Sequence, residues 1–157
     1  MLYGEGIFVG YRYYERIQLP VLFPFGHGLS YTNFEQKGLG ILTNDDESKL
    51  AVSLRIQNIG RVPGAEIIQV YISQRTPSIS RPLKELKAFE KVMLDPEEEK
   101  LIEISLSIKY VTSVWNEAEK KWQSEQGIYD VFVGNSSKNV LLQGSFEIKV
   151  TNLWHGL

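Results

Sequence analysis

Cysteine is absent from this 157-residue sequence, and methionine and histidine occur only twice each. The absence of cysteine excludes disulfide bonds and thiolate-ligated zinc sites. It does not locate the protein, because secreted domains can also lack cysteine. No run approaches the roughly 20 apolar residues that a membrane helix requires. The sequence therefore predicts neither a cysteine-based metal centre nor a membrane span.

An excess of charge of one sign is also missing. The 17 basic and 19 acidic residues give a net charge of −2 and a sequence pI near 5.8. A chain with no basic surplus is not expected to bind nucleic acid or an anionic membrane surface. The first residues lack the basic start and apolar stretch of a signal peptide, so we expect none in this chain. The sequence does not indicate the cellular compartment of the protein.

What the sequence does contain is alternation of apolar and polar residues. Residues 49–58 place four aliphatic side chains on one face of an extended chain. Short strands at this spacing, without long amphipathic helices, predict an all-β fold, an antiparallel β-sandwich. We expect further strands or apolar strand faces at 68–72, 87–93, 102–108, 111–115, 121–124, 129–133 and 146–150, loops at 73–78 and 81–86, a charged turn at 95–99 and a tail at 151–157.

A bent segment at residues 23–34 joins the aromatic-rich start of the chain to these strands. Pro24 fixes its own φ and favours an extended conformation in the residue before it. Gly26 and Gly28 permit positive φ or close backbone approach on either side of His27. The segment carries too many aromatic residues for a solvated linker. We expect it to be buried against another surface.

The first residues of the chain form an arm rich in tyrosine, phenylalanine and glycine. The pattern at residues 9–16 fits either a short helix or an extended arm and does not decide between them. Large aromatic side chains need burial, and a small sandwich offers little surface. We therefore favour an interface arm whose partner lies outside this sequence. In isolation it would either fold down on its own sandwich or join two copies.

Several motifs in order identify a family. Pro-Phe-Gly-His-Gly-Leu-Ser-Tyr-Thr-Asn-Phe at residues 24–34 closely resembles a signature near the C-terminus of family 3 glycoside hydrolases, the β-glucosidases and their relatives. Residues 5–14, 84–92 and 127–137 resemble further blocks of that family. The resemblance implies an immunoglobulin or fibronectin type III-like sandwich at 34–157. Residues 1–33 would then be an arm and connector that ends the preceding domain. The family usually has glycine where Glu97 stands.

The resemblance implies that the whole enzyme removes terminal β-linked glucose with retention of configuration. Such hydrolysis needs two carboxyl groups at a defined separation. In the family they lie on a barrel domain and a second domain, and this chain resembles neither. We therefore expect no catalytic, cofactor-binding or metal-binding residue here. Glu5 is interpreted as structural, residues 97–99 as a solvated turn, and His27 as a hydrogen-bonded connector residue.

Two roles remain for the chain. The preferred one is packing against the parent's catalytic domains. The alternative is a binding module for polysaccharide or lignin, with Trp115 and Trp122 stacking on sugar rings, although the two can also pair simply to stabilise a hairpin. A protein-interaction domain has only the fold in its favour. Asn135 begins a glycosylation sequon that matters only in the secretory route. The proposed interdomain packing residues are Phe8, Tyr11, Tyr13, Phe23, Phe25, His27 and Tyr31.

Overall fold

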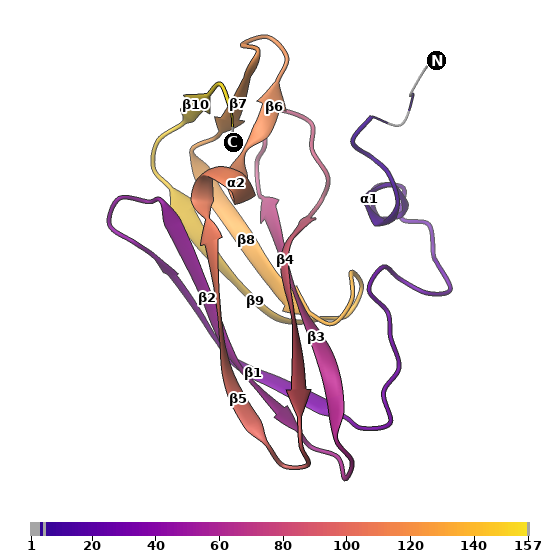
Figure 1. Ribbon diagram of the computed structural model, residues 1–157. Helices are drawn as coiled ribbons and strands as arrows, with labels where there is room; N and C mark the ends of the chain where they lie inside the picture. Colours follow the sequence, from indigo (N-terminus) through magenta and orange to yellow (C-terminus); the bar gives the residue numbers. More distant parts are fainter. Residues whose placement is uncertain (1–3, 5, 157) are drawn as a thin grey trace.

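The computed structural model describes residues 4 and 6–156, which form an antiparallel β-sandwich (Figure 1). One layer is a sheet in the order β1-β2-β5, and the other is a sheet in the order β4-β3-β8-β9. A small sheet, β10-β7-β6, lies at one end. The predicted all-β class is confirmed. The strands are β1 Phe34–Thr43, β2 Lys49–Asn58, β3 Gly64–Gln74, β4 Glu85–Leu94, β5 Glu99–Ser107, β6 Val114–Asn116, β7 Lys121–Ser124, β8 Gly127–Gly134, β9 Val140–Ile148 and β10 Asn152–Trp154.

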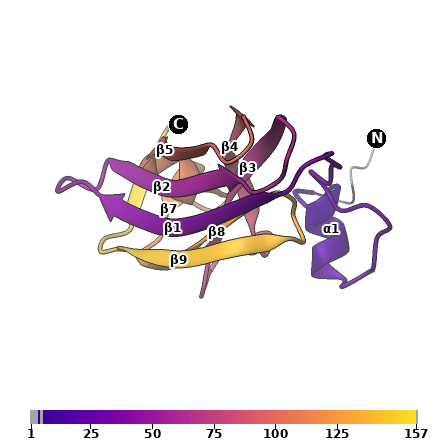
Figure 2. The same cartoon turned by 90° about the horizontal axis from the view of Figure 1, so that it is seen from below.

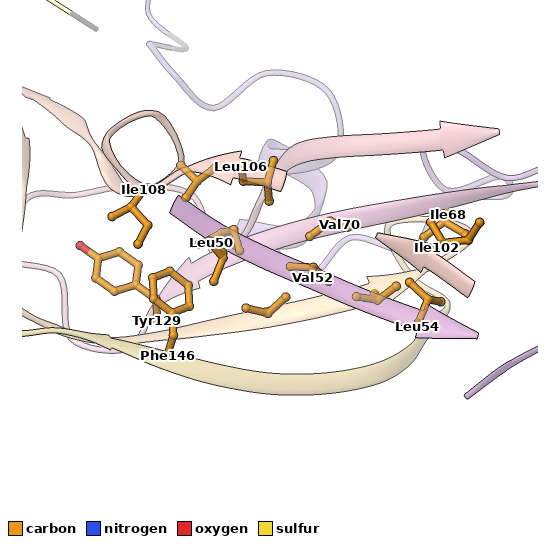
Figure 3. Packing of buried hydrophobic residues seen from close by; sticks show 14 of the residues in the cluster. Leu50, Val52, Leu54, Ile68, Val70, Ile102, Leu106, Ile108, Tyr129 and Phe146 are labelled. Atoms are coloured by element: carbon orange, nitrogen blue, oxygen red, sulfur yellow. The ribbon is translucent and has the colours of Figure 1, made fainter. Parts of the chain in front are cut away.

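The core lies between the two larger sheets and follows from the alternation in the sequence (Figure 3). On β2, Leu50, Val52 and Leu54 are fully buried, as the pattern predicts. They face apolar side chains of β3, β8 and β9, including Val70 and the stacked Tyr129–Phe146 pair. Each buried aliphatic side chain contributes about 1.5–3 kcal/mol relative to an exposed one. This core fixes the sandwich to which the arm attaches.

A short helix, α2 Ile108–Thr112, replaces the strand expected to continue through these residues. The side chain of Ser107 accepts a hydrogen bond from the Tyr110 amide and caps the start of the helix. Ile108 and Val111 are three positions apart, so a helix brings both into the core. The predicted hairpin is retained, but its first strand, β6, begins only at Val114.

The end of the chain also differs from expectation. Val150 was expected in the last strand, but β9 ends at Ile148 and the Val150 side chain is exposed. The expected tail contains β10, which pairs with β7 so that Trp154 lies opposite Trp122. A large aromatic side chain gains buried area by extending an existing hairpin. The small sheet therefore has three strands rather than two.

The turn before β5 shows why the resembled family usually has glycine where this chain has Glu97. This residue has φ 63°, in the left-handed region where glycine is favoured. Its backbone N–H donates to the Asn58 carbonyl oxygen at 3.0 Å, so the turn is held in place despite the conformation. The neighbouring Glu99 carboxylate is occupied by ion pairs with Lys37 and Arg55. The expected charged turn is present, and its third glutamate begins β5.

The start of the chain lies outside the sandwich, beside β3 and β4 (Figures 1 and 2). Among its described residues, 4 and 6–33, the one regular element is α1, Tyr11–Arg16, a short helix rather than an extended strand. The arm folds down on its own sandwich. Glu5 lies outside the described residues. The division at 33/34 stays a prediction, although β1 begins at Phe34.

Candidate functional site

The candidate site is a surface formed by α1 and the segment that follows it. We call this segment, residues 17–33, the connector. A six-residue helix is too short to be stable alone, so its contacts with the sandwich must hold it. The Tyr11 hydroxyl accepts a hydrogen bond from the Leu86 amide at 2.8 Å. The Tyr11 ring stacks on Phe25 at 5.0 Å and meets Tyr71 edge-on at 5.8 Å. Tyr11 therefore joins α1, the connector and β3.

Ion pairs fix α1 to the start of β4. Lys84 Nζ lies 2.6 Å from Glu15 Oε1, and both side chains are largely buried. Arg12 Nη2 lies 3.3 Å from Glu85 Oε1. Removing one partner of a buried pair leaves an uncompensated charge, which is strongly destabilising. The helix is thereby held in one position on the sandwich.

Glu85 is the centre of a larger cationic cluster. Its carboxylate also contacts Arg81 at 3.4 Å and Lys87 at 3.3 Å. Burial acts to raise the pKa of Glu85, but attraction to Lys87, Arg81 and Arg12 outweighs it and lowers the pKa. Burial lowers the pKa of Lys87. Three cationic side chains therefore share the Glu85 carboxylate, and the cluster joins α1, the loop before β4 and β4 itself.

The connector backbone is bonded to the end of the four-stranded sheet. The Ser137 amide donates to the Phe25 carbonyl oxygen at 2.8 Å. The Gln69 side-chain amide donates to the Gly26 and Asn135 carbonyl oxygens. Gly26 has φ 80°, and a Cβ there would collide with the Gln69 side chain. Glycine at position 26 thus suits the positive φ, and any larger residue would displace the Gln69 amide from its hydrogen bonds.

A buried asparagine holds the other end of the connector. The Thr32 hydroxyl donates to Asn58 Oδ1 at 2.6 Å. The same oxygen accepts from the Gly60 amide, and Asn58 Nδ2 donates to the carbonyl oxygens of Val62 and Leu94. Asn58 is fully buried at the end of β2. One side chain therefore ties the connector to two turns of the sandwich.

Although its backbone is fixed, the connector exposes large apolar side chains. Leu22 and Leu29 are 93% and 94% exposed, and Tyr31 is fully exposed. Phe23 is largely exposed, and its ring centroid lies 5.5 Å from that of the His27 ring. Exposed apolar patches mark interaction surfaces when the residues gather rather than scatter. The connector therefore presents a preformed apolar surface to solvent.

The proposed packing residues fall into two groups. Tyr11 and Phe25 stack on each other within the chain, although Phe25 is still 49% exposed, and Phe8 packs under the Arg16 guanidinium at 3.9 Å. Tyr31, Phe23 and His27 face solvent, while Tyr13 is half exposed against Tyr14. The roles of all seven at an interface stay predictions. The aromatic pattern does not indicate Leu22 and Leu29, although Leu22 lies between Pro20 and Pro24 and Leu29 follows Gly28, which is a usable signal.

The tryptophans lie on the small sheet, away from the connector (Figure 1). Trp115 and Trp122 are opposite each other, with ring centroids 5.7 Å apart and planes at 72°. This edge-to-face arrangement is typical of stabilising aromatic pairs. Lys109 Nζ lies 5.4 Å from the Trp154 ring. Sugar stacking by Trp115 and Trp122 stays a prediction, and their geometry does not form one flat platform.

Residues 4 and 6–156 contain neither of two other kinds of site. Within them no group of three or more histidine, aspartate or glutamate side chains is placed to hold a metal ion. Within the same residues, no helix has the length and apolar character needed to cross a membrane. The fold offers the connector surface as its most developed candidate site.

Comparison with known proteins shows which proteins the chain resembles. Residues 66–137 match the fibronectin type III-like domain family. A Schizosaccharomyces pombe protein named as a β-glucosidase is 55% identical over 99% of this chain, which spans 18% of that protein. A β-glucosidase I of Aspergillus fumigatus is 45% identical over the whole chain, which spans 19% of it. The chain thus corresponds to about a fifth of each relative.

Solved structures show the same correspondence. A β-glucosidase from Kluyveromyces marxianus, crystallised with glucose, superimposes with a TM-score of 0.95 at 46% identity, over 100% of this chain and 19% of that one. A β-glucosidase 3B from Thermotoga neapolitana has a TM-score of 0.90 at 37% identity, and the match covers 97% of this chain and 21% of that chain. A Bifidobacterium adolescentis structure described as a GH3 β-glucosidase has a TM-score of 0.88 at 36% identity, and the match covers 93% of this chain and 21% of that chain. The chain is a fibronectin type III-like domain of the kind carried by family 3 β-glucosidases.

Proposed function

We propose that this chain is the non-catalytic packing domain of a larger family 3 β-glucosidase, which hydrolyses terminal non-reducing β-D-glucosyl residues with retention. The observation that carries the proposal is the connector, whose backbone is fixed while Leu22, Leu29 and Tyr31 stay exposed. Covering these side chains with the catalytic domains would stabilise the enzyme without any change of connector conformation. Preorganisation of this kind lowers the cost of association.

The size of the relatives supports the proposal. Because the chain spans only 18–19% of those relatives, most of their length is available to cover the connector. A free chain that keeps this surface exposed is expected to self-associate through it. Binding to polysaccharide or lignin has less support, because the tryptophan rings stand edge to face rather than side by side.

The test compares three preparations on an aryl β-glucoside: the isolated chain, the full-length enzyme, and the enzyme with residues 1–157 deleted. By full-length enzyme we mean the polypeptide in which this chain is joined to its catalytic domains. We expect no hydrolysis by the isolated chain. Deletion should shorten the half-life of the enzyme on heating far more than it changes the KM of the molecules that remain active. Hydrolysis by the isolated chain, or an unchanged half-life after deletion, would contradict the proposal.

A further inference from the structure

A second apolar surface lies on the sandwich itself, on the outer face of β3 and β4. Ala65, Ile67 and Gln69 of β3 pair with Met93, Lys91 and Phe89 of β4, respectively, so all six share one face. Their neighbours Ile68, Val70 and Val92 point into the core, which places the six on the outer side of the sheet, where the connector covers Gln69. Phe89 is 68% and Met93 57% exposed. Apolar side chains on this sheet face remain uncovered by the arm.

This face continues into the connector. Gln69, directly opposite Phe89, is the residue that bonds the Gly26 carbonyl oxygen. Beyond it, a cleft of about 790 Å³ lies between the connector and the sheet, with Leu29 and Ile67 among its lining residues. The apolar connector, the cleft and the outer face of β3–β4 therefore form one continuous surface on one side of the molecule.

The lining of the cleft carries more lysine than carboxylate side chains. Lys91 and Lys138 line it, and neither forms an ion pair with any described residue. The Glu66 carboxylate in the same lining accepts hydrogen bonds from the Ile67 amide and from Asn135 Nδ2 and keeps its negative charge, so two ammonium groups face one carboxylate. An occupant of the cleft would thus meet two available ammonium groups beside an apolar face.

We propose that this surface docks an acidic segment with apolar side chains, contributed by the part of the full-length β-glucosidase outside residues 1–157. The inference rests on the proposed function and extends it from the connector to the sandwich. We infer an acidic occupant because Lys91 and Lys138 line the cleft. We place it in the same enzyme because the surface is continuous with the connector. The relatives, about five times longer than this chain, supply the length that such a segment needs.

The first test is zero-length carbodiimide cross-linking of the full-length enzyme, which joins lysine amines to carboxylates in direct contact. A mixture of isotopically light and heavy enzyme separates links within one molecule from links between copies. We expect Lys91 and Lys138 to link to aspartate or glutamate outside residues 1–157 of the same molecule. Lys149, an exposed lysine paired with Glu47, is the control and should link only within the chain. Links between copies, or none from Lys91 and Lys138, would overturn the proposal.

The second test is the double substitution Phe89→Ser and Met93→Ser. In the full-length enzyme we expect the half-life at an inactivating temperature to fall about tenfold or more. The melting temperature of the isolated chain should not fall, because both side chains are exposed there. The matched control is Leu42→Ser with Leu101→Ser, whose side chains on the other sheet are 72% and 54% exposed.

The two proposals fail in different ways. If the Phe89 and Met93 variant behaves like its control while a connector variant with Leu22 and Tyr31 replaced destabilises the enzyme, the connector role stands and the second surface is wrong. If neither variant differs from the control, both proposals are wrong. Destabilisation by both, with intramolecular cross-links from Lys91 or Lys138, is the result that supports this inference.

Discussion

Replacing Leu22 and Tyr31 together with serine should destabilise the full-length β-glucosidase by about 3 kcal/mol or more and leave the isolated chain almost unchanged. Burying one large apolar side chain stabilises a protein by about 1.5–3 kcal/mol. Two such side chains covered by the catalytic domains therefore contribute about 3 kcal/mol or more to the stability of the full-length enzyme. In the isolated chain both are almost completely exposed, and surface substitutions of this kind change stability by only about 0.5 kcal/mol. Urea unfolding of both proteins measures the difference.

The control for this prediction is the substitution of Leu42 and Leu101 with serine, which removes exposed apolar area from the other sheet. It should have little effect in either protein. Equal small effects of the connector and control pairs in the full-length enzyme would contradict a covered connector. Phe25→Ala is less informative, because Phe25 stacks on Tyr11 and its loss would weaken the isolated chain as well.

Asn58→Ala should strongly destabilise the isolated chain, by about 3 kcal/mol or more. It removes the acceptor of the Thr32 hydroxyl and the Gly60 amide, and the donor to two carbonyl oxygens. Leaving a buried polar group without a partner costs about 1–3 kcal/mol, and here several are left at once. We expect a lower melting temperature together with faster proteolysis of the connector.

Thr32→Val is the graded comparison. It removes one hydroxyl of similar volume, while Asn58 Oδ1 keeps its bond from the Gly60 amide, so the loss should be about 1 kcal/mol. Proteolysis of the connector should again accelerate, because the bond between Thr32 and the sandwich is gone. A loss below about 1 kcal/mol for Asn58→Ala would show that Asn58 does not hold this junction.

The sandwich could be predicted from the sequence because its strands bury one face each. At β2 the predicted bounds, 49–58, coincide with those observed, since Leu50, Val52, Leu54 and Ile56 all enter the core. At α2 the same reasoning was wrong. Ile108 and Val111 suit a helix as well as a strand, and the Ser107 cap that decides between them is a local hydrogen bond that apolar alternation does not reveal.

The candidate site was predictable only in part. The glycines, proline and aromatics of residues 23–34 indicate a bent, packed segment, but they do not say which rings pack within the chain. Tyr11 and Phe25 contact each other because α1 is held by Glu15–Lys84, a pair 69 residues apart. Such contacts depend on tertiary geometry. For the same reason the outer face of β3–β4 could not be linked to the connector before the fold was known.

The most direct test of the covered connector is hydroxyl-radical footprinting of the full-length enzyme beside the isolated chain. The account predicts strong protection of Leu22, Phe23, Leu29 and Tyr31 in the full-length enzyme, with Leu42 labelled equally in both. All four connector residues are largely or fully exposed in the isolated chain, so the contrast should be large. Equal labelling of these residues in the two proteins would contradict the account.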